Sequence, residues 1–266
     1  MLKDVTLGQF FPGQTPIHKL DPRTKLVLVI VYIVALFLAK WFVSYVVIAT
    51  FLAIVIAMSK IRLKVVLKNL KPLLFIIILT ALLNLFYGQG EPIAQFWIFK
   101  ITKSGIQNAV FMVLRISLLV AGTFMLTYTT SPIALTDGLE SLMNPLKVIK
   151  VPVHELSMMM CIALRFIPTL IEETDKIMKA QLSRGADFES GNIFKRIKSY
   201  VPVFVPLFVS AIRRATDLAQ AMDARCFDGS EGRSRMNPLK YSGTDYVSYA
   251  IVLVYLGCMI VYRCVM

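Results

Sequence analysis

The chain has 266 residues, of which 57% are hydrophobic and only 17% are charged. A soluble domain usually carries about a quarter charged residues and less than half apolar ones, so this composition excludes an ordinary soluble globular protein. The formal net charge of +13 resembles that of nucleic-acid-binding proteins. A membrane protein, however, collects Lys and Arg on its cytoplasmic loops, so we expect a lipid bilayer and no nucleic acid as a partner.

Uncharged apolar runs predict the transmembrane helices. A spanning helix needs roughly 17–25 mainly apolar residues, so four runs qualify alone and a fifth, shorter run qualifies with its flanks. In chain order the runs are Leu26–Ala39, which is the short one, Trp41–Ser59, Leu73–Gln89, Ile116–Thr136 and Tyr246–Tyr262. The expected fold class is therefore an all-α membrane protein with about five transmembrane helices.

Basic residues set the orientation of these helices. With the N-terminus inside, the cytoplasmic side receives the lysines and arginines of residues 1–25, 60–71 and 131–245. This arrangement places about 24 basic residues inside and about 4 outside, and it leaves Arg115 near a membrane face. We therefore expect a multi-pass protein with a cytoplasmic N-terminus.

The first helix has a clear start signal, since Asp21 is a good N-cap and Pro22 suits the first helical position. Only Lys40 and Trp41 separate the first two apolar runs, which predicts a very tight external turn. Such a short hairpin indicates either a strong tilt or a first helix that does not span the bilayer fully. The sequence leaves these two alternatives open.

Residues 60–71 alternate basic and apolar side chains at helical spacing and are followed by Pro72. This pattern predicts an interfacial helix on the cytoplasmic surface that ends at the proline. The next helix is expected from about Leu73 to Tyr87. A Gly-rich external loop should then lead to a helix from about Gly105 to Tyr128.

Two stretches of the long segment after Pro132 are too polar to span the membrane. Residues 200–212, which lie between them, carry no charge and are too apolar for an ordinary soluble loop. Apolar residues at three- and four-residue steps predict two long amphipathic helices, from about Val153 to Ser183 and from about Val201 to Ala224. Each begins apolar and ends charged, as a helix does that starts against the membrane and ends in the cytosol.

Both amphipathic helices end in an arginine between small residues, and Gly185 suits the left-handed position that follows a helix end. For one isolated arginine, attraction to the negative end of the helix dipole, about 0.3–1 kcal/mol, is a sufficient explanation. The recurrence favours docking, because small neighbours let a partner close around a guanidinium with its fork of donors. The candidate docking residues are Ser183, Arg184 and Gly185 in the first helix and Ala224, Arg225 and Cys226 in the second.

Three blocks of sequence carry a family pattern. The first block is Gly8-Gln-Phe-Phe-Pro-Gly with Ile17-His-Lys-Leu-Asp-Pro-Arg-Thr-Lys. The second block runs from Leu164-Arg-Phe-Ile-Pro to Leu182-Ser-Arg-Gly-Ala-Asp. The third block is Ala221-Met-Asp-Ala-Arg-Cys-Phe with Gly232-Arg-Ser-Arg. In this order they resemble the N-terminal signature and the two arginine motifs of the transmembrane T component of energy-coupling factor vitamin transporters. Cys226 departs from the pattern, since glycine is commoner there, but the side chain is still small.

The resemblance implies a non-catalytic subunit of the bacterial cell membrane that needs no cofactor or metal of its own. In this family two coupling helices cross, and the arginine that ends each one sits in a groove of one of two ABC-type ATPase subunits. Arg184 and Arg225 match these positions. Closure of the ATPase pair on ATP would reshape an apolar surface that holds an exchangeable, vitamin-binding membrane S component. The sequence itself has no Gly-x-x-x-x-Gly-Lys-Ser/Thr phosphate loop.

The apolar runs and the long polar segment between them divide the chain into three expected parts. Residues 1–130 would form a membrane domain, residues 131–243 a cytoplasmic coupling module of two or three amphipathic helices, and residues 244–266 a C-terminal transmembrane helix. The T component of a cobalt or nickel transporter from the same superfamily stays open as the alternative function, although the N-terminal signature favours the vitamin type.

Two more distant functions find less support. An intramembrane metalloprotease would need histidine ligands near Glu172 and Glu173, but neither histidine of the chain has a second histidine three or four residues away. These glutamates are expected to pair with Lys176 and Lys179 on the same helix. A secondary transporter usually carries ionisable groups at mid-membrane, and apart from Arg115 the expected spans lack them.

Overall fold

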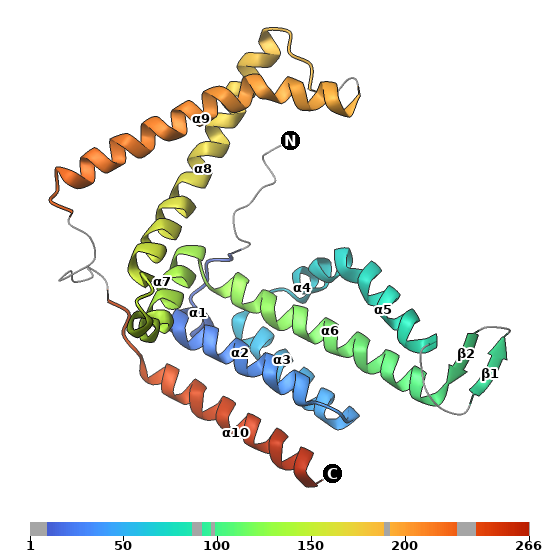
Figure 1. Ribbon diagram of the computed structural model, residues 1–266. Helices are drawn as coiled ribbons and strands as arrows, with labels where there is room; N and C mark the ends of the chain where they lie inside the picture. Colours follow the sequence, from blue (N-terminus) through green and yellow to red (C-terminus); the bar gives the residue numbers. More distant parts are fainter. Residues whose placement is uncertain (1–9, 87–91, 97–98, 189–191, 228–237, 266) are drawn as a thin grey trace. The chain divides into compact units, whose positions relative to one another are not determined.

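The computed structural model describes residues 10–86, 92–96, 99–188, 192–227 and 238–265 (Figure 1). The chain divides into two compact units. The bundle unit contains residues 8–139 and 239–266, and the long-helix unit contains residues 140–238. Each unit is described separately below. Residues 8 and 9 of the N-terminal signature and residues 232–235 of the second arginine motif lie outside the described ranges.

The bundle unit consists of helices and one small hairpin. In chain order its elements are α1 (Pro16–Lys19), α2 (Pro22–Leu38), α3 (Phe42–Ser59), α4 (Leu63–Leu70), a 3₁₀ turn (Lys71–Leu73), α5 (Leu74–Phe86), β1 (Pro92–Phe96), β2 (Phe99–Thr102), α6 (Lys103–Thr129), most of α7 (Pro132–Met143) and α10 (Gly243–Val265). The structure thus confirms the predicted all-α class, with helix ends within a few residues of those expected for α3, α5, α6 and α10.

Five helical segments of the described chain are long and apolar enough to cross a membrane, namely 42–59, 63–85, 103–129, 153–183 and 243–263. Four of them overlap predicted spans, although segment 63–85 also includes most of the predicted interfacial helix. The expected first span is α2, which has only 17 residues. The fifth segment is instead α8, the first of the predicted amphipathic helices, which qualifies by length and composition.

Local signals account for the start of α2 and for the α4–α5 junction. The Asp21 carboxylate accepts a hydrogen bond from the Arg23 backbone N–H, and Pro22 occupies the first helical position, as predicted. Helix α4 ends before Pro72, as predicted, but the chain continues through one 3₁₀ turn directly into α5. The Gly-rich segment before α6 was expected to be a loop, and this was wrong in part. Residues 92–102 include an antiparallel two-stranded hairpin.

Helix α6 forms the centre of the bundle unit and packs against α2, α3 and α5 (Figure 1). Its Gly122 allows α2 to approach closely, because a Cβ added there would lie 2.3 Å from the Tyr32 ring. The Tyr32 hydroxyl donates to the Leu118 carbonyl at 2.8 Å, so the ring is both packed and hydrogen-bonded. The core around it is apolar and includes Leu36, Tyr45, Ile48 and Met259.

Arg115 of α6 has a structural partner. Its Nη2 donates to the Ala39 carbonyl at 3.1 Å and to the Tyr45 hydroxyl at 2.7 Å, and its Nε also donates to that hydroxyl. Ala39 follows α2 and Tyr45 lies in the first turns of α3. The guanidinium therefore closes the tight turn between the two helices. These hydrogen bonds explain why Arg115 lies in a transmembrane helix without invoking an ion path through the membrane.

The long-helix unit contains the end of α7, a 3₁₀ segment (Asn144–Ile149), α8 (Val153–Ser183) and α9 (Ile193–Asp223). Helix α8 has the predicted bounds. Helix α9 begins eight residues before the expected Val201, because Pro202 and Pro206 are accommodated inside it. A proline inside a helix removes one backbone hydrogen bond, which is why the sequence pattern places the start next to the first proline.

Helices α8 and α9 cross (Figure 1). Glu173 of α8 forms an ion pair with Arg214 of α9 at 3.0 Å and accepts a hydrogen bond from the Ser210 hydroxyl. Gln181 Nε2 donates to the Pro202 carbonyl at 3.4 Å. Glu173 was expected to pair with lysines of its own helix; Lys176 does interact with it electrostatically, but its ion pair is with Arg214. The partner lies on the other helix, which a reading of one helix at a time does not reveal.

Candidate functional site

The end of α8 is a complete Schellman turn. The Gly185 N–H donates to the Leu182 carbonyl at 3.0 Å, and the Ala186 N–H donates to the Gln181 carbonyl at 3.0 Å. Gly185 has φ of +85°, the left-handed conformation predicted for it. Arg184 is the residue on which the helix ends, with φ of −88° and ψ of 5°. This geometry places its side chain at the tip of the helix.

The end of α9 repeats the same turn, residue by residue. The Cys226 N–H donates to the Asp223 carbonyl at 2.9 Å, and the Phe227 N–H donates to the Met222 carbonyl at 3.0 Å. Cys226 takes the left-handed position with φ of +54°. Arg225 therefore corresponds to Arg184. The departure from glycine leaves the turn intact, because a left-handed single residue is tolerated at a cost of about 1–2 kcal/mol.

The candidate docking residues are accessible in both turns. Ser183, Arg184, Gly185, Ala224, Arg225 and Cys226 are all exposed. The Ser183 hydroxyl donates to the Lys179 carbonyl at 3.0 Å, so this side chain folds back on its helix and leaves the arginine uncovered. Nothing lies within 4 Å of the position that a Gly185 Cβ would occupy. Each turn can therefore present a guanidinium that a concave partner surface is able to enclose.

The N-terminal signature forms a buried joint between helix ends. The Lys25 ammonium donates to the carbonyls of His18 and Thr129, at 3.0 and 2.9 Å, and so connects α1 to the last residue of α6. The Asp21 backbone N–H donates to a carboxylate oxygen of Asp245, at 2.9 Å, at the start of α10. Asp21, Lys25 and Asp245 are all buried.

Asp245 is a residue that sequence reasoning missed. Its second carboxylate oxygen accepts a hydrogen bond from the Ser242 N–H at 2.7 Å. One side chain therefore caps α10 and also accepts the hydrogen bond from Asp21, the residue before α2. The local signal was Ser242 followed three residues later by an acidic residue, which is typical of a helix start. The sequence did not indicate that Asp245 would contact Asp21, because 224 positions separate the two residues.

The residues that a metalloprotease would use do not come together. Within the described residues, no group of three or more His, Cys, Asp or Glu side chains could hold a metal ion. His18 contacts Phe11 and Thr15, whereas His154 Nδ1 lies 3.0 Å from a carboxylate oxygen of Glu140. Glu173 is engaged with Ser210 and Arg214. These contacts account for both histidines and for Glu173 as structural residues.

Comparison with known proteins matches the chain over almost its full length. The model of the CbiQ family, described as cobalt transport protein, matches residues 13–237. Several relatives carry the name energy-coupling factor transporter transmembrane protein EcfT. The one from Ruminiclostridium cellulolyticum is 50% identical over 260 residues, covering 98% of this chain and 97% of the relative. That of Thermosediminibacter oceani is 51% identical over 248 residues, covering 93% and 94% of the two chains.

A relative from Bacillus subtilis with the same name is 44% identical over 261 residues, which is 98% of each chain. The match includes both long helices and both Schellman turns, as well as the bundle unit. With the helical spans and the signature blocks in place, the chain belongs to the family of energy-coupling factor transporter transmembrane proteins, which the CbiQ family model also recognises.

Proposed function

We propose that this chain is the coupling subunit of an energy-coupling factor importer of the bacterial cell membrane. Its two exposed terminal arginines dock two ABC-type ATPase subunits, and its apolar surface holds a vitamin-binding S component. The observation that carries the proposal is the repetition of one six-residue turn, with its exposed arginine, at the ends of two crossing helices. One helix end would require one partner; two equivalent ends suit a pair of equivalent ATPase subunits.

The crossing of α8 and α9 supports a mechanical role for this pair. The ion pair of Glu173 and Arg214 joins the two helices well before either arginine-bearing end. A displacement applied at Arg184 or Arg225 would therefore be transmitted to the crossing by two long, continuous helices. In this proposal the residues of the docking turns bind partners, and ATP hydrolysis takes place on the ATPase subunits.

An uncovered apolar face on α9 supports the proposed S-component contact. Phe204 is 70% exposed, Phe208 is 65% exposed and Ile212 is 52% exposed, and these residues follow one another at four-residue steps on one face of the helix. Exposed aromatic and aliphatic groups in such a row are typical of a surface that is covered by lipid or by another protein. We propose that the S component covers part of it.

Reversal of both docking charges tests the ATPase contact. The Arg184→Glu/Arg225→Glu variant should lose co-purification with the two ATPase subunits, because a carboxylate cannot donate the hydrogen bonds of a guanidinium and carries the opposite charge. The matched control is Lys176→Glu/Arg213→Glu, which makes the same charge change at exposed positions within the same helices. An ATPase complex that survives in the first variant contradicts the proposal, as does an equal loss in the control.

A cobalt or nickel transporter subunit is the second candidate function, and the description of the matching family model favours it. The two candidates differ in the cargo-binding partner rather than in this chain. Purification of the assembled transporter, followed by identification of the small membrane subunit and its bound cargo, separates them. A bound organic vitamin supports the first candidate, and a bound transition-metal ion supports the second.

A further inference from the structure

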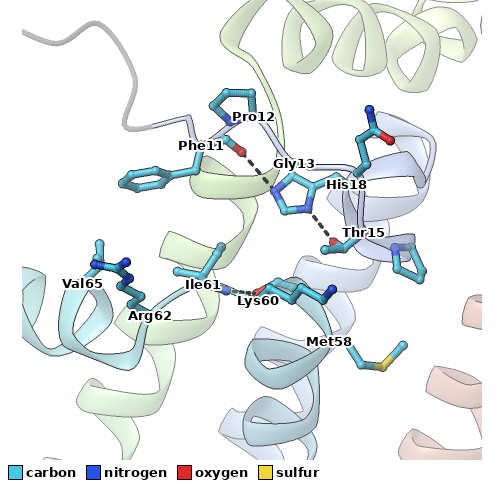
Figure 2. A pocket seen from close by; sticks show the side chains of 13 residues that line it. Phe11, Pro12, Gly13, Thr15, His18, Met58, Lys60, Ile61, Arg62 and Val65 are labelled. Atoms are coloured by element: carbon cyan, nitrogen blue, oxygen red, sulfur yellow. Dashed lines mark hydrogen bonds between the residues drawn. The ribbon is translucent and has the colours of Figure 1, made fainter.

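The bundle unit contains a cavity of about 660 Å³ between the N-terminal segment and the turn that joins α3 to α4 (Figure 2). Residues 11–16 and His18 form one side, and residues 58–62 with Val65 form the other. Its volume is in the range of about 300–1,000 Å³ that small-molecule sites occupy. Because the apolar helix α3 ends at Ser59, the cavity lies where a spanning helix leaves the hydrocarbon layer.

Two cations line this cavity. Lys60 and Arg62 are exposed, and no Asp or Glu is among the described residues that line the cavity. Neither side chain forms an ion pair within the described residues. The turn that carries them is well defined, because the Lys60 N–H donates to the Ala57 carbonyl at 3.2 Å and Lys60 has φ of +57°. Within the part of the chain that the structure describes, this wall of the cavity is therefore positive and has no acidic partner.

His18 orders the opposite wall. Its Nε2 donates to the Phe11 carbonyl at 3.1 Å, and in the neutral ring Nδ1 accepts from the Thr15 hydroxyl at 2.6 Å (Figure 2). A Cβ on Gly13 would lie 2.8 Å from the ring, so the segment wraps closely around it. Burial lowers the pKa of His18, and the charge of Lys25 lowers it further, so the ring is neutral at neutral pH. The positive charge of the cavity thus comes from Lys60 and Arg62.

A second cavity, of about 290 Å³, adjoins the first, and Met58 lines both. It lies among α2, α3, α6 and α10 and is mainly apolar. Ile54 and Ile251 line it and are 53% and 54% exposed, so it is open toward the side from which lipid approaches the bundle. Among the described residues that line it, Lys25 alone is charged, and the Lys25 ammonium is already bound to two carbonyl oxygens.

Helix α4, next to the basic cavity, has the character of a helix that lies in the membrane surface. Leu63 and Leu67 are 62% and 63% exposed, and Lys64 and Lys68 are exposed as well. Exposed leucines together with lysines on one short helix are typical of an interfacial helix. This places the neighbouring Lys60 and Arg62 at the depth of the lipid headgroups.

We propose that the two cavities together bind one anionic phospholipid, with its phosphate at Lys60 and Arg62 and one acyl chain running past Met58 into the apolar cavity. A basic pocket beside an apolar groove at this membrane depth matches the two chemically different parts of such a lipid. A small soluble anion would use only the first cavity, and a zwitterionic lipid would bring a cationic group to a positive wall. The proposal is independent of the docking arginines.

Native mass spectrometry of the full chain, titrated with phosphatidylglycerol or phosphatidylcholine in detergent, tests the headgroup contact. The Lys60→Asn/Arg62→Gln variant should bind phosphatidylglycerol about ten- to thirtyfold more weakly than the unaltered chain, with little change for phosphatidylcholine. Asparagine is chosen at position 60 because it tolerates the left-handed conformation. The control, Lys64→Gln/Lys68→Gln, removes the same charge from exposed residues that do not line the cavity and should bind nearly normally.

A second pair of variants tests the acyl-chain contact with all charges retained. Met58→Trp should obstruct the proposed path of the acyl chain past residue 58 and weaken phosphatidylglycerol binding by about tenfold, whereas Ala57→Trp, at an exposed neighbour that lines neither cavity, should not. Equal weakening in the cavity and control variants of either pair would overturn the proposal, since it would indicate general attraction to a basic surface. Displacement of the lipid by millimolar glycerol 3-phosphate would also overturn it, in favour of a small-anion site.

Discussion

Gly185 and Cys226 occupy the same position in two copies of one helix-ending turn, and both have a left-handed backbone, with φ of +85° and +54°. In each copy, the residue before this position is an exposed arginine. Glycine adopts this backbone without steric cost, whereas cysteine has a Cβ that opposes it. The two helix-ending turns are therefore equal in geometry but unequal in local stability.

Exchange of these residues should change local stability in opposite directions. Cys226→Gly relieves the left-handed strain of about 1–2 kcal/mol but adds the conformational entropy that glycine loses on folding, so it should stabilise the end of α9 by about 0.5–1 kcal/mol. Gly185→Cys should destabilise the end of α8 by a similar amount. Hydrogen exchange of the backbone amides of residues 185–186 and 226–227 measures the effect. Slower exchange at Phe227 in the first variant is expected, and faster exchange there would contradict the assigned turn.

The contact of Glu173 and Arg214 should behave as a coupled pair. Arg214→Glu alone places two carboxylates together and should weaken the α8–α9 contact, by about 1 kcal/mol because the pair is partly exposed. The double exchange Glu173→Arg/Arg214→Glu should restore part of the loss. Thermal stability of the purified chain, measured for both single variants and the double variant, gives the coupling energy. Additive losses would show that the two residues do not interact.

Removal of the Asp245 carboxylate should destabilise the bundle unit. Asp245→Ala leaves the buried N–H group of Asp21 without its acceptor, which costs about 1–3 kcal/mol, and it removes the cap on the more exposed N–H group of Ser242. A marked fall of the melting temperature in detergent is therefore expected. Asp217→Ala removes an exposed carboxylate from α9 and should have little effect. Equal melting temperatures for the two variants would argue against the joint.

Acidification should destabilise the chain partly through His18. Burial is the largest cause that lowers the pKa of His18 in the folded chain, so the unfolded chain takes up this proton at a higher pH than the folded chain. The free energy of unfolding should accordingly fall as the pH decreases below about 6.5, the ordinary histidine value. In His18→Gln this part of the fall should be absent. Melting temperatures at pH 7.5, 6.5 and 5.5 compare the two chains, and parallel curves would contradict the assignment.

Much of the fold followed from local patterns. The uncharged runs predicted α3, α5, α6 and α10, because a bilayer imposes a length and a composition on each span separately. Asp21 and Pro22 predicted the start of α2, and Gly185 predicted the turn after α8, since caps depend on neighbouring residues only. The start of α9 was placed late because helices tolerate prolines when their other contacts compensate, and local rules do not include those contacts.

The sequence by itself determined the class of the protein and the C-terminal ends of its two long helices, and it predicted the six candidate docking residues, because helix ends depend on periodicity and short-range backbone geometry. The tertiary structure alone decided the partners of Arg115, Glu173 and Asp245, and it alone brought Lys60 and Arg62 to the wall of a cavity. These features depend on groups that are far apart in the chain. The packing of helices against one another brings such groups together, and no local pattern records it.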